Sequence, residues 1–474
     1  MANHRDSNDL RNIVAETTAQ IVHYQSLIEK LLAQRERTQL QLDALVYPVL
    51  KIPPEITSEV FYQCLPAPHH WNSADPGKAP MLLSHVCRAW REIALSTPAL
   101  WAEVEFGLVR GRRRAHVLET WLSRAGSIPL SIRLNIWDLK QGDTASDVFE
   151  TFARHSYKIQ SLNLGIRWRR LQDMEKARYR WSFPLLQVLD LHGDRFQDEP
   201  SLEIFSDCPL LREVSLSAFP ASSISLPWQQ LTKFTGRLCT VANCLEILCL
   251  IPNLRECTFT NCAQDEESPD LPVLSHSNLQ SLTIEDEGEF INGLVMLKFL
   301  SLPALQTFVL QFSGWIDMQE FDGIFSSFLS RCSPPLGKFS FRPSHQFTDF
   351  DTARLFHMPK LFDLQIWNPS SHFISNFTDS FMNADTNFLP QLQHLTFRSC
   401  RATMLKLSHG LSARWHARDQ AEFARLETVR LEFWSDMDFT EDALLPFQKL
   451  LADGMDICIN ERNIGRDSIT VVGK

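Results

Sequence analysis

One short template recurs along most of the chain and constrains its fold more than any other feature. Each copy reads apolar, two variable residues, apolar, one variable residue, apolar. Full copies start at Ile159, Leu186, Leu211, Leu254, Leu279, Leu305, Leu336, Leu361, Leu392 and Leu426, and a degraded copy without the third apolar residue starts at Leu231. Successive copies start 20–34 residues apart. Each unit is too small to bury its own apolar ridge, so the units must stack on one another.

A period of this length with one strand-like motif per unit is typical of a leucine-rich-repeat solenoid. In such an array the strands pair in parallel along one inner face. The linking segments often read as helices, as in the apolar spacing of Val241, Leu245 and Leu248. The alternative is an ordinary α/β domain with chance matches, which ten full copies in sequential order disfavour.

Composition limits the function more than the fold. At 474 residues the chain is long for a single core, which agrees with a repeat array. Its formal net charge of -10 argues against nucleic-acid binding, because phosphate contacts require a basic face. No run approaches the ~18 apolar residues of a membrane span. We therefore expect no membrane partner, and the polar start of the chain predicts a cytoplasmic or nuclear protein.

The 11 cysteines include no CxxC pair. Five of them gather within one stretch: Cys239, Cys244, Cys249, Cys257 and Cys262. Their spacing does not match a zinc-ligand pattern, and no histidine lies between His192 and His276. We predict reduced cysteines that are mostly buried and pack as small hydrophobes, with no metal and no cofactor.

Residues 10–45 have the pattern of one long polar helix. Val14, Ile21, Ile28 and Leu42 lie on a seven-residue grid, and Tyr24, Leu31 and Leu45 occupy the second heptad position. Thr17, Arg35 and Thr38 interrupt this seam. The pattern suits either a dimeric coiled coil or a helix whose stripe packs on its own chain, and the second is slightly favoured because the first short helix follows closely. Tyr47-Pro48 predicts the end of the helix.

Two short helical patterns follow within residues 52–101. The first places Ile52, Ile56, Val60, Phe61 and Leu65 on one face, with Pro53 and Pro54 in its first turn. The second places the following apolar residues on one face: Leu82, Leu83, Val86, Cys87, Trp90, Ile93 and Ala94. Pro98 ends it. Two helices this short cannot be stable alone and need a partner.

This stretch resembles the F-box, and most of the chain resembles the F-box proteins with leucine-rich repeats that are abundant in fungi. The resemblance rests on Ile52-Pro53-Pro54-Glu55-Ile56, on Val86-Cys87-Arg88-Ala89-Trp90-Arg91 and on Thr97-Pro98-Ala99-Leu100-Trp101. The opening Leu-Pro that is usual in the family is Ile-Pro here, and the loop 66–80 is longer than in a compact F-box.

The resemblance implies a substrate receptor of an SCF-type cullin–RING ubiquitin ligase. The F-box would bind a Skp-type adaptor, which docks on a cullin, and the repeats would capture an unidentified protein substrate. The residues that would contact the adaptor or pack the helices are Ile52, Pro53, Ile56, Val60, Phe61, Leu65, Val86, Cys87, Trp90, Ile93, Leu100 and Trp101. About half of them, notably Trp90, would serve equally well as internal core, and the sequence alone does not separate the two groups.

The sequence leaves two alternative functions. One is a protein-interaction scaffold that uses the repeats without a ligase. The other is an enzyme, which has little support because the chain has no Gly-rich phosphate loop, no GxSxG and no HExxH. We therefore predict no catalytic residues and no enzyme.

The substrate would bind to the inner face of the strands. The variable positions of the template point out from that face. Early copies place Asp190, Glu213, Glu256 and Glu285 there, and late copies place Lys338, Arg342, Trp367, Arg398 and Arg430 there, with Asp363 and Glu432 as exceptions. We interpret this as a face that is acidic near the F-box and basic toward the C-terminus, against the alternative of scattered surface charges.

The predicted fold is therefore α followed by α/β in four parts. Residues 1–46 form a long helix, 47–101 a small helical F-box with an insert at 66–80, and 102–460 an irregular leucine-rich-repeat solenoid with a parallel inner sheet. Residues 461–474 form a tail. Ile457, Ile459, Ile469, Val471 and Val472 give the end of the chain either a last short strand pair or a frayed end.

Overall fold

The structure is a computed structural model, and it divides into two compact units, Met1–Leu100 and Trp101–Lys474. It describes residues 2–43, 48–66, 75–106, 114–137, 144–177, 179–194, 201–263, 271–288, 292–314, 317–343, 351–383, 387–400, 404–416, 423–434, 441–462 and 469–472. Each unit is described by itself below.

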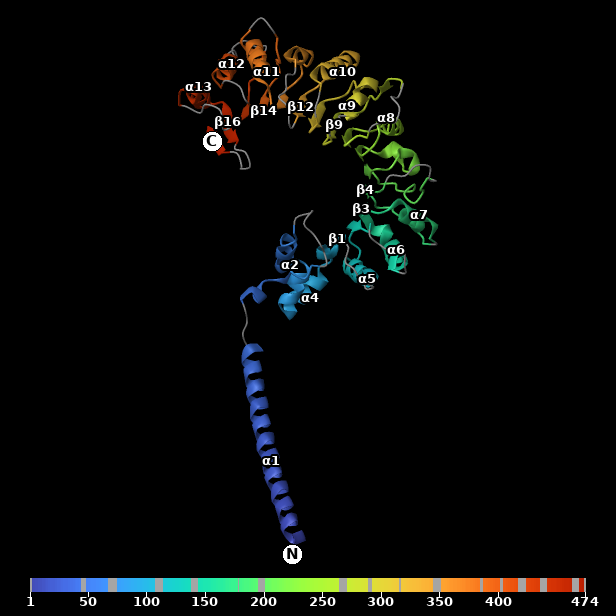
Figure 1. Cartoon of the computed structure of the whole chain (residues 1–474), viewed down its shortest axis with the longest axis vertical. Helices are drawn as coiled ribbons and strands as arrows, with labels where there is room; N and C mark the ends of the chain where they lie inside the picture. The colour runs from blue at the N-terminus through green and yellow to red at the C-terminus, as the bar shows by residue number, and fades with distance from the viewer. Residues whose placement is uncertain are drawn as a thin grey trace. The chain divides into compact units, whose positions relative to one another are not determined.

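Unit 1 begins with a single long helix, α1 (Ala2–Asp43), which confirms the predicted N-terminal helix (Figure 1). Every side chain described on α1, from Asp9 to Leu42, is exposed. The described residues thus leave the apolar stripe of α1 uncovered. The predicted helix end at Tyr47 lies outside the described residues, and a 3₁₀ turn, η1 (Pro48–Lys51), begins at the adjoining proline.

Three short helices and a second 3₁₀ turn follow: α2 (Pro54–Gln63), α3 (Met81–Val86), α4 (Arg88–Ser96) and η2 (Pro98–Trp101). Pro53 occupies the N-cap position of α2 and Pro54 is its first residue, so both prolines lie at the start of the helix as predicted. The prediction of one continuous second helix is wrong. Cys87 has extended backbone angles, φ -155° and ψ 173°, and its Sγ accepts a hydrogen bond from the Trp90 amide, so it ends α3 and caps α4.

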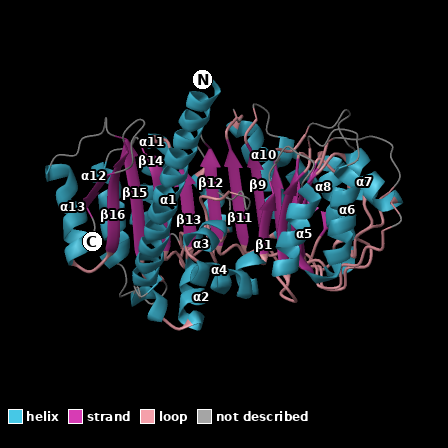
Figure 2. Ribbon diagram, turned by 90° about the horizontal axis from the view of Figure 1, so that it is seen from below, coloured by secondary structure: helices cyan, strands magenta, loops and turns pink. Residues whose placement is uncertain are grey.

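Unit 2 is built on one sheet of 15 strands (Figure 2). Their order in the sheet follows the chain: β1 (Glu103–Phe106), β2 (Leu130–Asn135), β3 (Ile159–Gly165), β4 (Val188–His192), β5 (Glu213–Ser217), β6 (Lys233–Arg237), β7 (Glu256–Thr260), β9 (Ser281–Asp286), β11 (Thr307–Phe312), β12 (Lys338–Pro343), β13 (Asp363–Trp367), β14 (His394–Cys400), β15 (Thr428–Trp434), β16 (Asp456–Arg462) and β17 (Ile469–Val472). All neighbours are parallel except β16 and β17, which are antiparallel. Of the two expectations for the end of the chain, a last strand pair or a frayed end, the structure has the strand pair.

Helices connect the strands and lie along one side of the sheet, on the convex side of unit 2 (Figure 1). They are α5 (Arg114–Arg124), α6 (Thr144–His155), α7 (Trp168–Lys176), α8 (Val241–Leu250), α9 (Asn292–Val295), α10 (Met318–Cys332), α11 (Ser371–Met382), α12 (Met404–His416) and α13 (Glu441–Ala452). Shorter links are the 3₁₀ turns η3 (Ser156–Lys158), η4 (Ala221–Ser223), η5 (Trp228–Gln230), η6 (Met296–Phe299) and η7 (Thr352–His357), and the strand pair β8 (Leu274–Ser275) with β10 (Leu300–Ser301). No helix among the described residues is both long enough and apolar enough to cross a membrane.

The template residues form the core of unit 2. Each copy, including the degraded one, is a strand or ends in one, and its apolar residues are buried. The register places equivalent template positions side by side, so that Phe308 lies between Leu282 and Phe339 on the neighbouring strands. The apolar ridge of each strand is therefore covered by the ridges of its neighbours and by the helices. The predicted strands and their parallel pairing are confirmed.

The degraded copy has a steric explanation. Gly236 occupies its third apolar position, and a Cβ placed there would lie only 2.9 Å from Cδ1 of Phe259 on the next strand. Phe259 is fully buried. Its ring occupies the volume that a template side chain fills in the other copies, so the sequence loses one apolar residue without losing the strand.

We expect Gly236→Ala to lower the free energy of unfolding by about 1–3 kcal/mol, because the added methyl group overpacks the core against Phe259. Gly323→Ala is the matched control. Gly323 lies inside α10 with no atom within 4 Å of its ideal Cβ, so alanine there should raise the stability by roughly 0.5–1 kcal/mol. Urea unfolding of both variants checks the pair, and effects of the same sign would contradict it.

Candidate functional site

The short helices of unit 1 pack through one aromatic contact. The Phe61 ring of α2 is 1% exposed and meets the Trp90 ring of α4 edge to face, with 5.0 Å between centroids. Arg91 donates from Nε to the carbonyl oxygen of Ser84 at 2.8 Å, which ties α4 to α3. Phe61, Leu83 and Ala94 are buried, so this small unit has an interior of its own.

Other apolar side chains of the same helices point to solvent. On α2 and just before it, Ile52 is 39%, Ile56 55% and Val60 52% exposed. On α3, Leu82 and Val86 are one helical turn apart and are both exposed. We call these five residues the exposed apolar ridges. Covering such side chains with a partner removes apolar surface from water, which favours binding. The exposed apolar ridges are therefore the candidate docking surface of unit 1.

The structure thus separates the residues predicted to contact an adaptor into three groups. Ile52, Pro53, Ile56, Val60 and Val86 are exposed. Leu65, Cys87, Trp90 and Ile93 are half-buried, and Phe61, Leu100 and Trp101 are buried. The site prediction omitted Leu82, although its four-residue spacing from Val86 was a usable signal.

Trp101 packs inside unit 2. Its ring lies edge to face on Trp121 at 4.7 Å, and the Arg124 guanidinium lies 4.5 Å from the ring centroid. Both partners belong to α5. With its side chain fully buried, Trp101 fixes α5 next to β1 and does not present a docking surface. Leu100, the last residue of unit 1, is also fully buried.

The sheet forms the concave side of unit 2, opposite the helices (Figure 1). The variable positions alternate with the buried template residues along each strand, so they face away from the helices. Register aligns these positions into rows that cross the sheet. One row contains Glu285, Arg342, Trp367 and Arg398 on β9, β12, β13 and β14. Asp190 and Arg430 belong to a second row, and Glu213, Glu256 and Lys338 to a third. All nine predicted substrate residues therefore lie on this face.

The early half of this face is not purely acidic. Lys233 lies between Glu213 and Glu256 in its row, and its Nζ is 3.4 Å from Glu213 Oε2. Asp190 is 3.1 Å from His192 Nε2 and accepts a hydrogen bond from Asn163. Burial alone would raise the pKa of Asp190, but hydrogen bonds from neighbours including His192 hold that pKa below its ordinary value. Asp190 and Glu213 thus each have a polar partner on an adjacent strand.

In the late half, Arg430 forms a bidentate pair with Asp456 on the next strand, at 3.0 and 2.7 Å. This hydrogen-bonded carboxylate raises the pKa of Arg430. Asp456 follows the last template copy and was missed by the sequence prediction. The pair fixes the Arg430 side chain along the sheet and offsets its charge.

Three neighbouring side chains form a different arrangement, which we call the Arg–Trp–Arg cluster. The Trp367 ring is flanked by the guanidinium groups of Arg342, at 5.7 Å from the ring centroid, and Arg398, at 5.2 Å. Arg342 is oriented further by hydrogen bonds to Ser340 and Gln365. Burial, together with the positive charge of Arg398, lowers the pKa of Arg342. Two oriented cations beside an aromatic ring are suited to an acidic group on a partner protein.

The cysteine stretch lies in the core of unit 2. Cys239, Cys244, Cys257 and Cys262 are buried, and Cys249 is exposed. Burial raises the pKa of the Cys244 and Cys257 thiols. The prediction of mostly buried cysteines is confirmed. In the part of the chain that the structure describes, no three His, Cys, Asp or Glu residues are grouped to hold a metal ion.

A polar hollow of about 390 Å³ lies at the N-terminal ends of β5 to β9. Asn253 donates to the Gln229 carbonyl at 2.7 Å, and Asn278 donates to the Pro252 carbonyl at 2.9 Å. The side-chain amides of Asn253 and Asn278 thus satisfy backbone carbonyls that precede them in the chain, which is a structural role.

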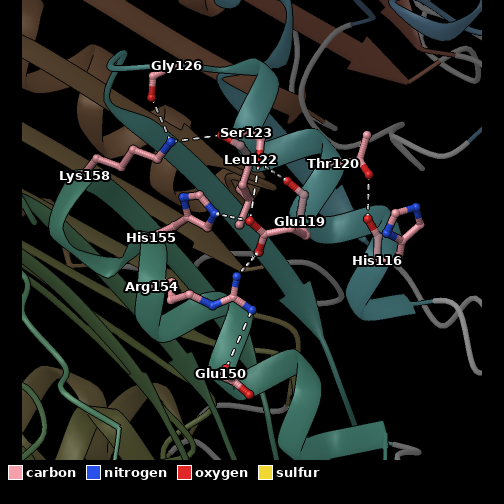
Figure 3. Close-up of polar contacts among 10 residues, drawn as sticks. All are labelled: His116, Glu119, Thr120, Leu122, Ser123, Gly126, Glu150, Arg154, His155 and Lys158. Carbon is pink, nitrogen blue, oxygen red and sulfur yellow. Dashed lines mark hydrogen bonds and ion pairs between the residues drawn. The ribbon is translucent and has the colours of Figure 1, made fainter.

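A polar cluster around the buried Lys158 joins α5 to α6 and η3 (Figure 3). Lys158 is 4% exposed and donates from Nζ to the carbonyl oxygens of Leu122 and Gly126, at 2.9 and 2.8 Å, which caps the C-terminal end of α5. Glu119 contacts His155 at 3.3 Å and Arg154 at 3.1 Å. Burial, and then the charge of Lys158, lowers the pKa of His155.

This cluster predicts a pH-dependent stability. A histidine whose pKa is lowered in the folded state stays neutral there, so protonation below its unfolded pKa of about 6.5 favours unfolding. Stability should therefore fall as the pH drops through and below that value, against the opposing attraction of Glu119. His155→Gln should weaken this fall in urea unfolding series from about pH 7.5 to about pH 5. Identical pH profiles for the two proteins would rule the cluster out as their source.

No protein-family model matches the chain, and no curated protein matches it.

Proposed function

We propose that this chain is the substrate-recognition subunit of an SCF-type cullin–RING ubiquitin ligase. In this proposal residues 47–101 are an F-box that binds a Skp-type adaptor, and residues 102–460 are a leucine-rich-repeat solenoid that captures a protein substrate. The observation that carries the proposal is the set of exposed apolar ridges at positions of the F-box-like motif.

Two features of unit 1 support adaptor binding. Ile56 and Val60 each precede a buried residue of α2, Thr57 and Phe61, so one side of the helix faces the interior while an adjacent side stays apolar and exposed. Helices this short depend on tertiary packing for stability, and a partner that covers the ridges would supply it. Apolar patches on otherwise polar surfaces commonly mark protein interfaces.

Two features of unit 2 support substrate capture. The sequential parallel strands with helices on the convex side match the expected build of a leucine-rich-repeat array, whose concave face is a common binding surface. The Arg–Trp–Arg cluster lies on that face and offers aromatic surface and positive charge, which are enriched in interface hot spots.

Affinity capture of the tagged chain from its native cells, followed by mass spectrometry, tests the ligase assignment. The proposal predicts that a Skp-type adaptor and a cullin are recovered with the chain. If other proteins are recovered reproducibly while no adaptor is present, the chain is a scaffold and the ligase assignment fails.

Reversing the charge of the Arg–Trp–Arg cluster should weaken substrate binding without changing adaptor binding. We expect Arg342→Glu with Arg398→Glu to reduce proximity labelling of substrate by at least about tenfold, because two favourable charge contacts become repulsive. Recovery of the adaptor should not change. Lys449→Glu, an exposed reversal on α13, is the control. Loss of substrate in the control as well, or in neither protein, would contradict a role for the cluster.

A further inference from the structure

The longest exposed apolar stripe of the described residues lies on α1. The heptad positions a are Val14, Ile21, Ile28, Arg35 and Leu42, and the positions d are Leu10, Thr17, Tyr24, Leu31 and Thr38. Every one of these side chains is exposed, from 51% at Ile21 to 65% at Val14 among the large apolar ones. The stripe has the heptad spacing of a coiled-coil seam, and nothing in the described residues covers it.

We propose that the second strand is α1 of another copy of this chain, packed antiparallel. The reason is the position of Arg35. In a parallel, in-register pair each a position faces its own copy, so Arg35 would face Arg35 and place two like charges in the seam. In an antiparallel pair a positions face d positions, and the two arginines lie far apart.

One antiparallel register matches the whole seam. It places Leu10 opposite Leu42, Ile21 opposite Leu31 and Tyr24 opposite Ile28, and each of these contacts occurs twice because the pair has twofold symmetry. Of the interrupting residues, Thr17 lies opposite Arg35, and Thr38 lies opposite the apolar Val14.

The flanking positions fit the same register. Leu27 lies opposite its own copy near the symmetry axis on one flank, and Gln25 does so on the other. Gln20 lies opposite Gln34. The other flank pairs are Ile13 with Gln41, Thr18 with Leu32 and Arg11 with Gln39, so the register brings no like charges together on either flank.

The two threonines of the seam need no partner across it. Thr17 donates its hydroxyl to the Ile13 carbonyl at 2.7 Å, and Thr38 donates to the Gln34 carbonyl at 2.9 Å. Their hydroxyl groups are satisfied within the helix, so burial of these side chains leaves no donor unpaired. Arg35 can lay its aliphatic stem along Thr17 while its guanidinium stays in water.

Cysteine cross-linking of the full chain tests both the dimer and its direction. The described part of α1 contains no native cysteine. Leu10→Cys and Leu42→Cys are made on separate chains and mixed under oxidising conditions, with wild type as the background control. The proposal predicts a disulfide between the two different variants and none between identical ones, because residues 10 of the two copies are about 48 Å apart.

Light scattering completes the test. We expect the full wild-type chain to have twice the monomer mass, and Ile28→Asp to weaken association at least about tenfold. A monomeric wild type would overturn the proposal. So would cross-links between identical Leu10→Cys chains, which would indicate a parallel pair.

Discussion

Phe308→Ala should destabilise unit 2 locally and severely. The ring is fully buried and lies among Phe325, Phe328 and Phe339, at centroid distances of 6.1, 5.7 and 6.1 Å. Truncation of a phenylalanine in such a site costs about 3–5 kcal/mol. Because each strand of the sheet pairs only with its neighbours, the loss should be concentrated on β9, β11 and β12.

Hydrogen exchange resolved by strand provides the measurement. Amides of β9, β11 and β12 should exchange much faster in the variant, while those of β3 and β15 keep most of their protection. Phe356→Ala, at a ring that is 42% exposed, is the control and should change little. Equal acceleration in every strand would show a single cooperative core and would contradict the proposed repeat array.

The second large effect concerns the exposed apolar ridges. Ile56→Asp with Val60→Asp should weaken binding of a Skp-type adaptor by at least about a hundredfold, because two carboxylates would be buried in an apolar interface. Both side chains are more than half exposed, so the free protein should fold normally.

Recovery of the adaptor with the double variant measures this effect, and circular dichroism verifies the helices. Val273→Asp makes the same kind of change at a side chain of unit 2 that is 51% exposed, and adaptor recovery with it should equal that of wild type. If the double variant retains the adaptor, the ridges are not the docking surface.

The fold of unit 2 could be predicted well because one template repeats. The same apolar spacing at each copy determines both the strand and its buried face, and even the copy that starts at Leu231 forms a strand. The template could not show that the side chain on one strand fills core space left by a small residue on the next. The Phe259 ring packs against Gly236, which has no side chain. The two residues are 23 apart in the sequence but lie on adjacent strands.

The short helices were harder to predict because apolar spacing does not tell interior from surface. Ile56 and Phe61 fit the same periodic pattern, yet one is 55% and the other 1% exposed. The break at Cys87 was also missed. A cysteine seldom caps a helix, and the apolar pattern continues across it without interruption.

The sequence predicted which charged residues lie on the concave face, but it did not predict which residues they pair with. Lys233 lies in the degraded copy and Asp456 beyond the last copy, so neither was read as part of the face. Both lie beside predicted residues only because neighbouring strands bring them together. The sequence predicted only that the late half of the concave face is basic. The structure places the Arg–Trp–Arg cluster in one row of that face, around Trp367.

The most direct test of the central claim is a binding titration between the purified full chain and a purified Skp-type adaptor by calorimetry. The account predicts saturable binding with one adaptor per chain and the negative heat-capacity change of apolar burial. Absence of binding at adaptor concentrations up to about 100 μM, with a chain shown to be folded, would contradict it.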